Sequence, residues 1–150
     1  MIVQDRARHR GRTAARIGAW AFVATGIGHV TLAGLLPSTG DLLAVRRQME
    51  QVSLPLVPSH SIGDLMQGFS VAMSVLLVAT GVSVLLMTRH GRAMEQSQAA
   101  LTLLLSLGLL VTALLRFPAP PIVLMSVASV AFAVALHASR HATMPAPTGR

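Results

Sequence analysis

Four polar side chains have the chemistry of a binding site or a proton relay, and each lies within a long apolar run. They are His29, Asp64, Gln67 and Arg116. An imidazole that titrates near neutrality, a carboxylate, an amide and a guanidinium could together hold a small polar ligand or pass a proton. Ionisable groups in apolar segments are costly to bury and tend to pair with one another. These four residues are therefore the candidate ligand-binding or proton-relay site.

The spacing of these residues places them near one end of a set of helices. At 1.5 Å per residue, His29 lies about 10 Å below the outer end of its run, and Asp64 and Gln67 lie about 5 and 9 Å inside theirs. Arg116 stands at the outer end of the third run. We predict an Asp64–Arg116 ion pair, with His29 and Gln67 hydrogen-bonded beneath it.

Each member also has a simpler structural explanation. The segment Ser61–Asp64 has the spacing of a capping box, so Asp64 could serve only to start a helix. Arg116 could extend its side chain to lipid headgroups. A single interior histidine such as His29 is more often hydrogen-bonded within the fold than a ligand. Structural and functional roles both stay open.

The elements that must position these residues are four apolar runs, each close to the roughly 20 residues needed to cross a bilayer. Hydrophobic residues make up 53% of the 150-residue chain and charged residues 11%. The fold class we predict is all-α, a four-transmembrane-helix bundle in residues 17–139, between a basic N-terminus (1–16) and a tail (140–150). The predicted spans are Ile17–Leu36, Ile62–Thr88, Gln98–Phe117 and Ile122–Ser139. A cleaved signal is the alternative for the first run, which exceeds the 7–15 apolar residues of a typical signal core.

The arginines predict the orientation. The net charge is +7, and every basic residue is Arg. In a four-span arrangement the N-terminus, the second connection and the tail fall on one side, so the positive-inside rule makes both termini cytoplasmic. No aromatic residue accompanies the N-terminal arginines, so we predict no nucleic-acid partner. The arginines on this side are Arg6, Arg8, Arg10, Arg12, Arg16, Arg89, Arg92, Arg140 and Arg150.

The long outer connection has its own predicted structure. Asp41 can cap a short helix in which Leu42, Val45, Met49 and Val52 share one face. This helix could lie along the lipid surface or cover the helix ends as a lid. Prolines in residues 54–58 then predict an extended strap into the second span.

Small and hydroxyl residues recur along each span at helical intervals. Such residues allow close backbone approach and hydrogen bonds between membrane helices, so we predict that these stripes face inward. They could also line a narrow polar pocket. The members are Gly18, Thr25, Gly26, His29 and Ala33; Asp64, Gln67, Ser74 and Gly81; Thr102, Ser106, Ala113 and Arg116; and Ser126, Ser129, Ala133 and His137.

The sequence contains no catalytic motif and predicts no metal site. Cysteine is absent, which excludes thiolate ligands and disulfides. The chain has six histidines, and we find no two with ligand spacing on one helix. No cofactor is predicted, and haem or quinone stays open as an alternative.

Several of these segments resemble a family of small bacterial four-span membrane proteins of uncharacterised function. The similarity rests on Gly26–His29, Met49, Ser61–Ser70 and Phe117-Pro118, within residues 17–139. It implies a bacterial inner membrane and no particular reaction. We predict a non-enzymatic accessory or small-ligand-binding protein in the lipid bilayer, with a membrane-protein partner or a second copy open. The alternative is a redox or transport component that uses the candidate site for protons, quinone or haem.

Overall fold

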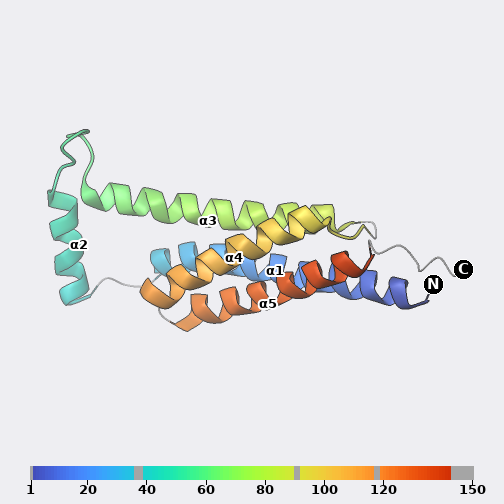
Figure 1. Ribbon diagram of the computed structural model, residues 1–150. Helices are drawn as coiled ribbons and strands as arrows, with labels where there is room; N and C mark the ends of the chain where they lie inside the picture. Colours follow the sequence, from blue (N-terminus) through green and yellow to red (C-terminus); the bar gives the residue numbers. More distant parts are fainter. Residues whose placement is uncertain (1, 36–38, 90–91, 117–118, 143–150) are drawn as a thin grey trace, which may run out of the picture.

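The computed structural model describes residues 2–35, 39–89, 92–116 and 119–142, and these residues form five helices (Figure 1). The helices are α1 (Ile2–Leu35), α2 (Asp41–Gln51), α3 (Ile62–Met87), α4 (Gln96–Arg116) and α5 (Ala119–Ala142). The predicted all-α class is confirmed. The predicted span ends Leu36 and Phe117, residue Pro118, the tail residue Arg150 and the side chain of Ala33 lie outside the described residues.

Three of these helices are long and apolar enough to cross a bilayer. They are α3, α4 and residues Ala119–His141 of α5, with mean hydropathies of 2.3, 2.1 and 2.1. Large apolar side chains cover their outer surfaces; Leu101 and Leu104 of α4 are 67% and 69% exposed. Exposed apolar faces of this extent mark an interaction surface, and on helices of this length and hydropathy that surface faces the bilayer. The chain is therefore a multi-pass membrane protein in contact with the bilayer.

Helix α1 joins the basic N-terminus and the first apolar run in one element of 34 residues. At 1.5 Å per residue it is about 50 Å long, which exceeds the roughly 30 Å hydrocarbon core. Its basic half must therefore reach past one membrane surface if its apolar half crosses. Helix α1 is not among the three helices that meet the length and hydropathy criteria, so the four-span count stays a prediction.

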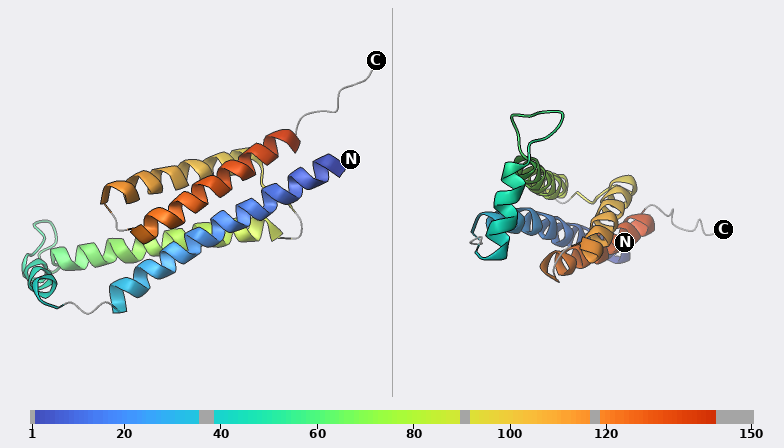
Figure 2. Two further views of the ribbon diagram at one scale, coloured as in Figure 1. Left: turned by 90° about the horizontal axis from the view of Figure 1, so that it is seen from below. Right: turned by 90° about the vertical axis from the view of Figure 1, so that its left-hand side faces the viewer.

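The four long helices contact one another in the order α3, α1, α5, α4. Helix α1 packs along both α3 and α5, and α4 packs along α5. The views along and across the helices agree that α1 lies between α3 and α5 (Figure 2). Within the described residues α3 and α4 do not pack extensively on each other. This spacing leaves room for a cavity between them.

Close helix contacts form where glycines meet backbone. A Cβ atom added at Gly81 of α3 would lie 2.6 Å from the carbonyl oxygen of Ala19, and one added at Gly26 would lie 2.7 Å from that of Ser74. On the other side of α1, the rings of Phe22 and Phe132 have centroids 5.4 Å apart. Small residues that admit such approach hold membrane helices together through dispersion contacts.

Among the described side chains, the predicted inward-facing stripes are confirmed for eight members and wrong for five, and Thr25, His29 and Ser126 are half-buried. Gly18, Gly26, Ser74, Gly81, Thr102, Ser106, Ala113 and Ser129 are buried. The side chains of Asp64, Gln67, Arg116, Ala133 and His137 are exposed. The charged and amide groups among these lie near helix ends, where leaving the interior relieves their desolvation cost.

Most hydroxyls in the spans bond to their own helix and not across helices. Thr25, Ser74 and Thr102, for example, donate to the carbonyl four residues earlier, at 2.8, 2.9 and 2.9 Å. A carbonyl of the preceding turn lies within reach of these hydroxyls, so they need no partner on another helix. The expectation of many interhelical hydroxyl bonds is therefore wrong.

The outer connection contains the predicted short helix, α2, which packs against the start of α3 (Figure 1). Its N-cap is Gly40 at φ 58°, and no side-chain capping bond forms, so the predicted cap by Asp41 is wrong. The apolar side chains of Leu42 and Val45 are exposed, as an interfacial helix requires.

The segment after α2 is a closed loop and not the predicted extended strap. The amide of Leu54 donates to the carbonyl of His60 at 2.9 Å, and that of Ile62 donates to Val52 at 2.9 Å. These bonds bring Ser53 and Ser61 side by side in an antiparallel bridge. The prolines exclude helix as expected, but turns let the chain reverse.

Candidate functional site

His29 joins α1 to α3. Its Nε2 atom lies 2.8 Å from the hydroxyl oxygen of Ser70, and the imidazole is half-buried. The close contact of Gly26 with the Ser74 backbone brings this turn of α1 against α3. Packing through glycine thus places His29 within hydrogen-bonding distance of a residue 41 positions away in the chain.

Asp64 belongs to a capping box at the start of α3. One of its carboxylate oxygens accepts hydrogen bonds from the Ser61 amide (2.8 Å) and the Ser61 hydroxyl (2.9 Å). The Ser61 hydroxyl in turn accepts from the Asp64 amide at 3.1 Å. Both halves of the box are present, so the structural explanation accounts for Asp64.

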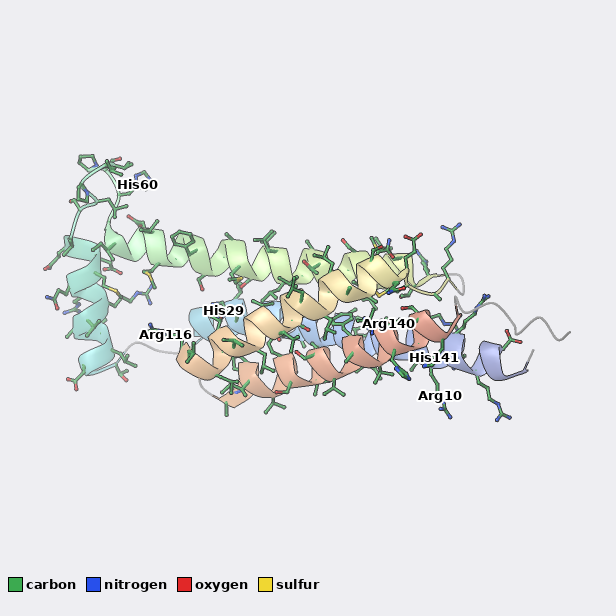
Figure 3. All side chains as sticks on the ribbon, in the orientation of Figure 1. Arg10, His29, His60, Arg116, Arg140 and His141 are labelled. Atoms are coloured by element: carbon green, nitrogen blue, oxygen red, sulfur yellow. The ribbon has the colours of Figure 1, made fainter. Side chains whose placement is uncertain are left out.

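Gln67 and Arg116 are both exposed. The carboxylate of Asp64 is hydrogen-bonded to Ser61, whereas the predicted partner was Arg116. Among the described side chains no ion pair links Asp64 to Arg116. Figure 3 places Arg116 at the same end of the molecule as His29. Asp64 and Gln67 lie in the first two turns of α3, which begins at this same end beside α2 (Figure 1). Of the four residues, His29 alone lines the cavity described next.

A cavity of about 140 Å³ lies beside His29, between α1, α3, α4 and α5. Its walls are apolar apart from the His29 imidazole and the hydroxyls of Thr25 and Thr112, which donate to backbone carbonyls of their own helices. A dry apolar cavity of about 150 Å³ can hold a benzene molecule. This cavity therefore fits one ring or a short length of hydrocarbon. Its other lining residues include Gly28, Met73, Leu77, Pro121 and Met125.

Sequence reasoning missed Ser70 and most of the cavity wall. Counting depth could have found Ser70, because it lies about 13 Å inside α3 from Ser61, close to the depth of His29 on α1. Nothing in the sequence signals the separation of α3 and α4, which depends on how all four helices pack. The spacing of Gly28 in the sequence does not distinguish a glycine that lines a cavity from one that packs against a neighbouring helix.

The statement that no two histidines have ligand spacing on one helix is wrong. Helix α5 continues to Ala142, so His137 and His141 lie one turn apart with ring centroids 4.4 Å from each other. Among the described residues no group of three or more His, Asp or Glu gathers to hold a metal ion. The pair is exposed and lies at the same end as Arg10 and Arg140 (Figure 3), and these charges repel cations.

Comparison with protein-family models, with curated proteins and with solved structures gives no match. The chain has the features of a small multi-pass membrane protein, and its function must be argued from its own site.

Proposed function

We propose that this protein is a non-enzymatic membrane protein that binds a small, largely apolar molecule in the cavity beside His29. The observation that carries this proposal is the cavity itself, which residues of four helices line and one imidazole borders. Binding sites for small molecules are concave and mostly apolar, with a few polar groups that fix orientation. The cavity has this composition, with His29 as the orienting group.

The lining of the cavity favours binding over catalysis. His29 is the one titratable group among the described lining residues. The hydroxyl within hydrogen-bonding reach of its Nε2 is that of Ser70, which does not line the cavity, so this Ser–His pair does not present a nucleophile to a molecule held there. Asp64, the acid of the predicted site, caps α3 and does not line the cavity.

The proposed setting is a bacterial inner membrane, with the apolar half of α1 as a fourth span and both termini in the cytoplasm. The contacts of α1 with α3 and α5 along its length support this arrangement. The arginines in α1, beside α4 and at the end of α5 lie at one end, opposite α2, as the positive-inside rule requires.

The test is native mass spectrometry of protein purified in mild detergent, with identification of released small molecules. Gly28→Leu adds a side chain to the cavity wall, where a Cβ meets nothing within 4 Å. Gly34→Leu is the matched control, because Gly34 is on the same helix, is equally open and does not line the cavity. We expect a stoichiometric ligand on the wild type and on Gly34→Leu that Gly28→Leu loses. Equal occupancy of both variants would contradict the proposal.

The second candidate function is a redox or transport component that holds quinone or haem. The observation that favours quinone is an imidazole on the wall of a ring-sized cavity, since an imidazole N–H can donate to a quinone carbonyl. A haem macrocycle is larger than this cavity, so haem does not fit there. An ultraviolet–visible spectrum of the same preparation separates the candidates. A Soret band or a stoichiometric quinone would replace the first proposal by the second.

A further inference from the structure

A second cavity lies at the basic end of the helices, away from His29. Its volume is about 430 Å³, and α1, α5 and the segment leading into α4 enclose it. We propose that this cavity binds the phosphate of an anionic phospholipid headgroup. The residues that line this cavity include Arg8, Gly11, Arg92, Glu95, Ala138 and Ser139.

Close packing forms the floor of this cavity. A Cβ at Gly11 would lie 2.8 Å from the Cβ of Ala138, so α1 and α5 touch directly there. Arg8 is three residues before Gly11 on α1, and residues three apart share a helix face. The Arg8 side chain therefore rises from the line where the two helices meet.

The opposite wall is the segment of residues 92–96. Met94 is buried to 6% exposure and belongs to the hydrophobic core, which anchors this segment against the helices. The Glu95 carbonyl accepts from the Ala99 amide at 2.9 Å, so the segment continues directly into α4. Arg92 thus lines the same cavity as Arg8, although the two come from distant parts of the chain.

The charge of the lining selects an anion. Arg8 and Arg92 contribute two guanidinium groups against the single carboxylate of Glu95. The Ser139 hydroxyl donates to the Leu136 carbonyl of its own helix at 2.8 Å. Guanidinium groups bind phosphate oxygens through paired hydrogen bonds, and two of them can share one phosphate. Glu95 leaves the cavity with a net positive charge and adds an acceptor for a hydroxyl of the headgroup.

The position of the cavity selects a lipid as the source of the phosphate. Ser139 lies within the last turn of the apolar stretch Ala119–His141, so the cavity opens at the depth where a bilayer changes from acyl chains to headgroups. Basic pockets between membrane helices at this level bind anionic headgroups. A soluble phosphate ester has the same chemistry but no reason to concentrate there.

The experiment titrates the full-length protein in mild detergent with phosphatidylglycerol or phosphatidylcholine and counts bound lipids by native mass spectrometry. We expect the wild type to bind phosphatidylglycerol more tightly than phosphatidylcholine. Arg8→Gln/Arg92→Gln should lose about tenfold or more in its affinity for phosphatidylglycerol and none in its affinity for phosphatidylcholine. Arg46→Gln/Arg47→Gln removes two charges at α2, at the other end, and should leave the affinity unchanged. Arg8→Lys/Arg92→Lys retains the charge but not the planar guanidinium group, so its affinity for phosphatidylglycerol should lie between those of the wild type and the Gln variant. If the Gln variant does not fold, the Lys variant still tests the proposal.

Three results would overturn the proposal. They are equal binding of the two lipids, an equal loss in the α2 double variant, and displacement of phosphatidylglycerol by glycerol phosphate at the same concentration. The last would mean that a soluble phosphate ester occupies the cavity. Neither Arg8 nor Arg92 lines the His29 cavity, so failure of the lipid-binding proposal would leave the proposed function unaffected.

Discussion

The imidazole Nε2 of His29 lies 2.8 Å from the hydroxyl oxygen of Ser70, and this hydrogen bond links α1 to α3 beside the apolar cavity. Most other hydroxyls of the long helices satisfy themselves on their own backbone, as Ser74 does with the Ser70 carbonyl. The His29–Ser70 contact therefore has two effects. It contributes to the packing of α1 on α3, and it fixes the imidazole that a ligand in the cavity would meet.

A double-mutant cycle measures this contact. We expect His29→Ala and Ser70→Ala to be coupled by about 0.6 kcal/mol, with an upper bound near 1.7 kcal/mol, as for other hydrogen bonds between membrane helices. The measurement is the free energy of unfolding in mixed micelles with increasing sodium dodecyl sulfate. Ser83→Ala is the control partner, because Ser83 donates to the Ala79 carbonyl of its own helix. Full additivity of His29→Ala and Ser70→Ala would show that the hydrogen bond contributes nothing to folding.

Glycine contacts predict a second stability difference. Gly81→Ala places a Cβ 2.6 Å from the Ala19 carbonyl oxygen, so α1 and α3 must separate. We expect a loss of about 1–3 kcal/mol in the same unfolding assay. Gly68→Ala on the same helix meets nothing within 4 Å and should be neutral or stabilise by up to about 1 kcal/mol, because alanine favours helix. If both variants behaved alike, the close approach of α1 to α3 would be refuted.

The sequence predicts that the long helices exist because apolar runs of this length have one stable form in a bilayer. The structure begins α3 at Ile62 and ends α4 at Arg116, close to the predicted spans. Helix α1, however, begins at Ile2, well before the predicted start at Ile17, and α5 (Ala119–Ala142) extends beyond the predicted Ile122–Ser139 at both ends. The capping box at Ser61 and Asp64 is also readable from sequence, since it depends only on residues three apart. Local spacing determines both features.

The candidate site could be predicted only in part, because depth along a helix does not give direction around it. His29 and Arg116 lie at one end of the protein (Figure 3), where α3 begins with Asp64 and Gln67 in its first two turns (Figure 1), as their depths indicate. Rotation of α3 and α4 points Asp64, Gln67 and Arg116 outward and leaves His29 at the cavity. That rotation depends on where glycines admit a neighbouring helix, and it is a property of the whole packing arrangement.

Cysteine labelling from either side of the membrane tests the fourth span. The chain contains no cysteine, so each introduced thiol is unique. We place single cysteines at His9, Ser59 and His141, which are all exposed. If α1 crosses the bilayer, an impermeant reagent labels His9→Cys and His141→Cys from one side and Ser59→Cys from the other. Labelling of His9→Cys on the same side as Ser59→Cys would mean three spans, with α1 outside the hydrocarbon core.

Ser129 provides a test of the packing between the long helices. Its side-chain oxygen is buried and, within the described part of the chain, has no hydrogen-bond partner. A buried hydroxyl without a partner costs free energy, and alanine is a better helix former than serine. Ser129→Ala should therefore raise the free energy of unfolding by about 0.5–1 kcal/mol.

Ser106→Ala is the matched control, because Ser106 is fully buried but its hydroxyl donates to the Leu103 carbonyl at 2.8 Å. Removal of the Ser106 hydroxyl should therefore stabilise the protein less, or destabilise it. A loss of stability in Ser129→Ala larger than in Ser106→Ala would mean that the Ser129 hydroxyl has a partner in the membrane, and would place a second molecule or a bound water at that point of α5.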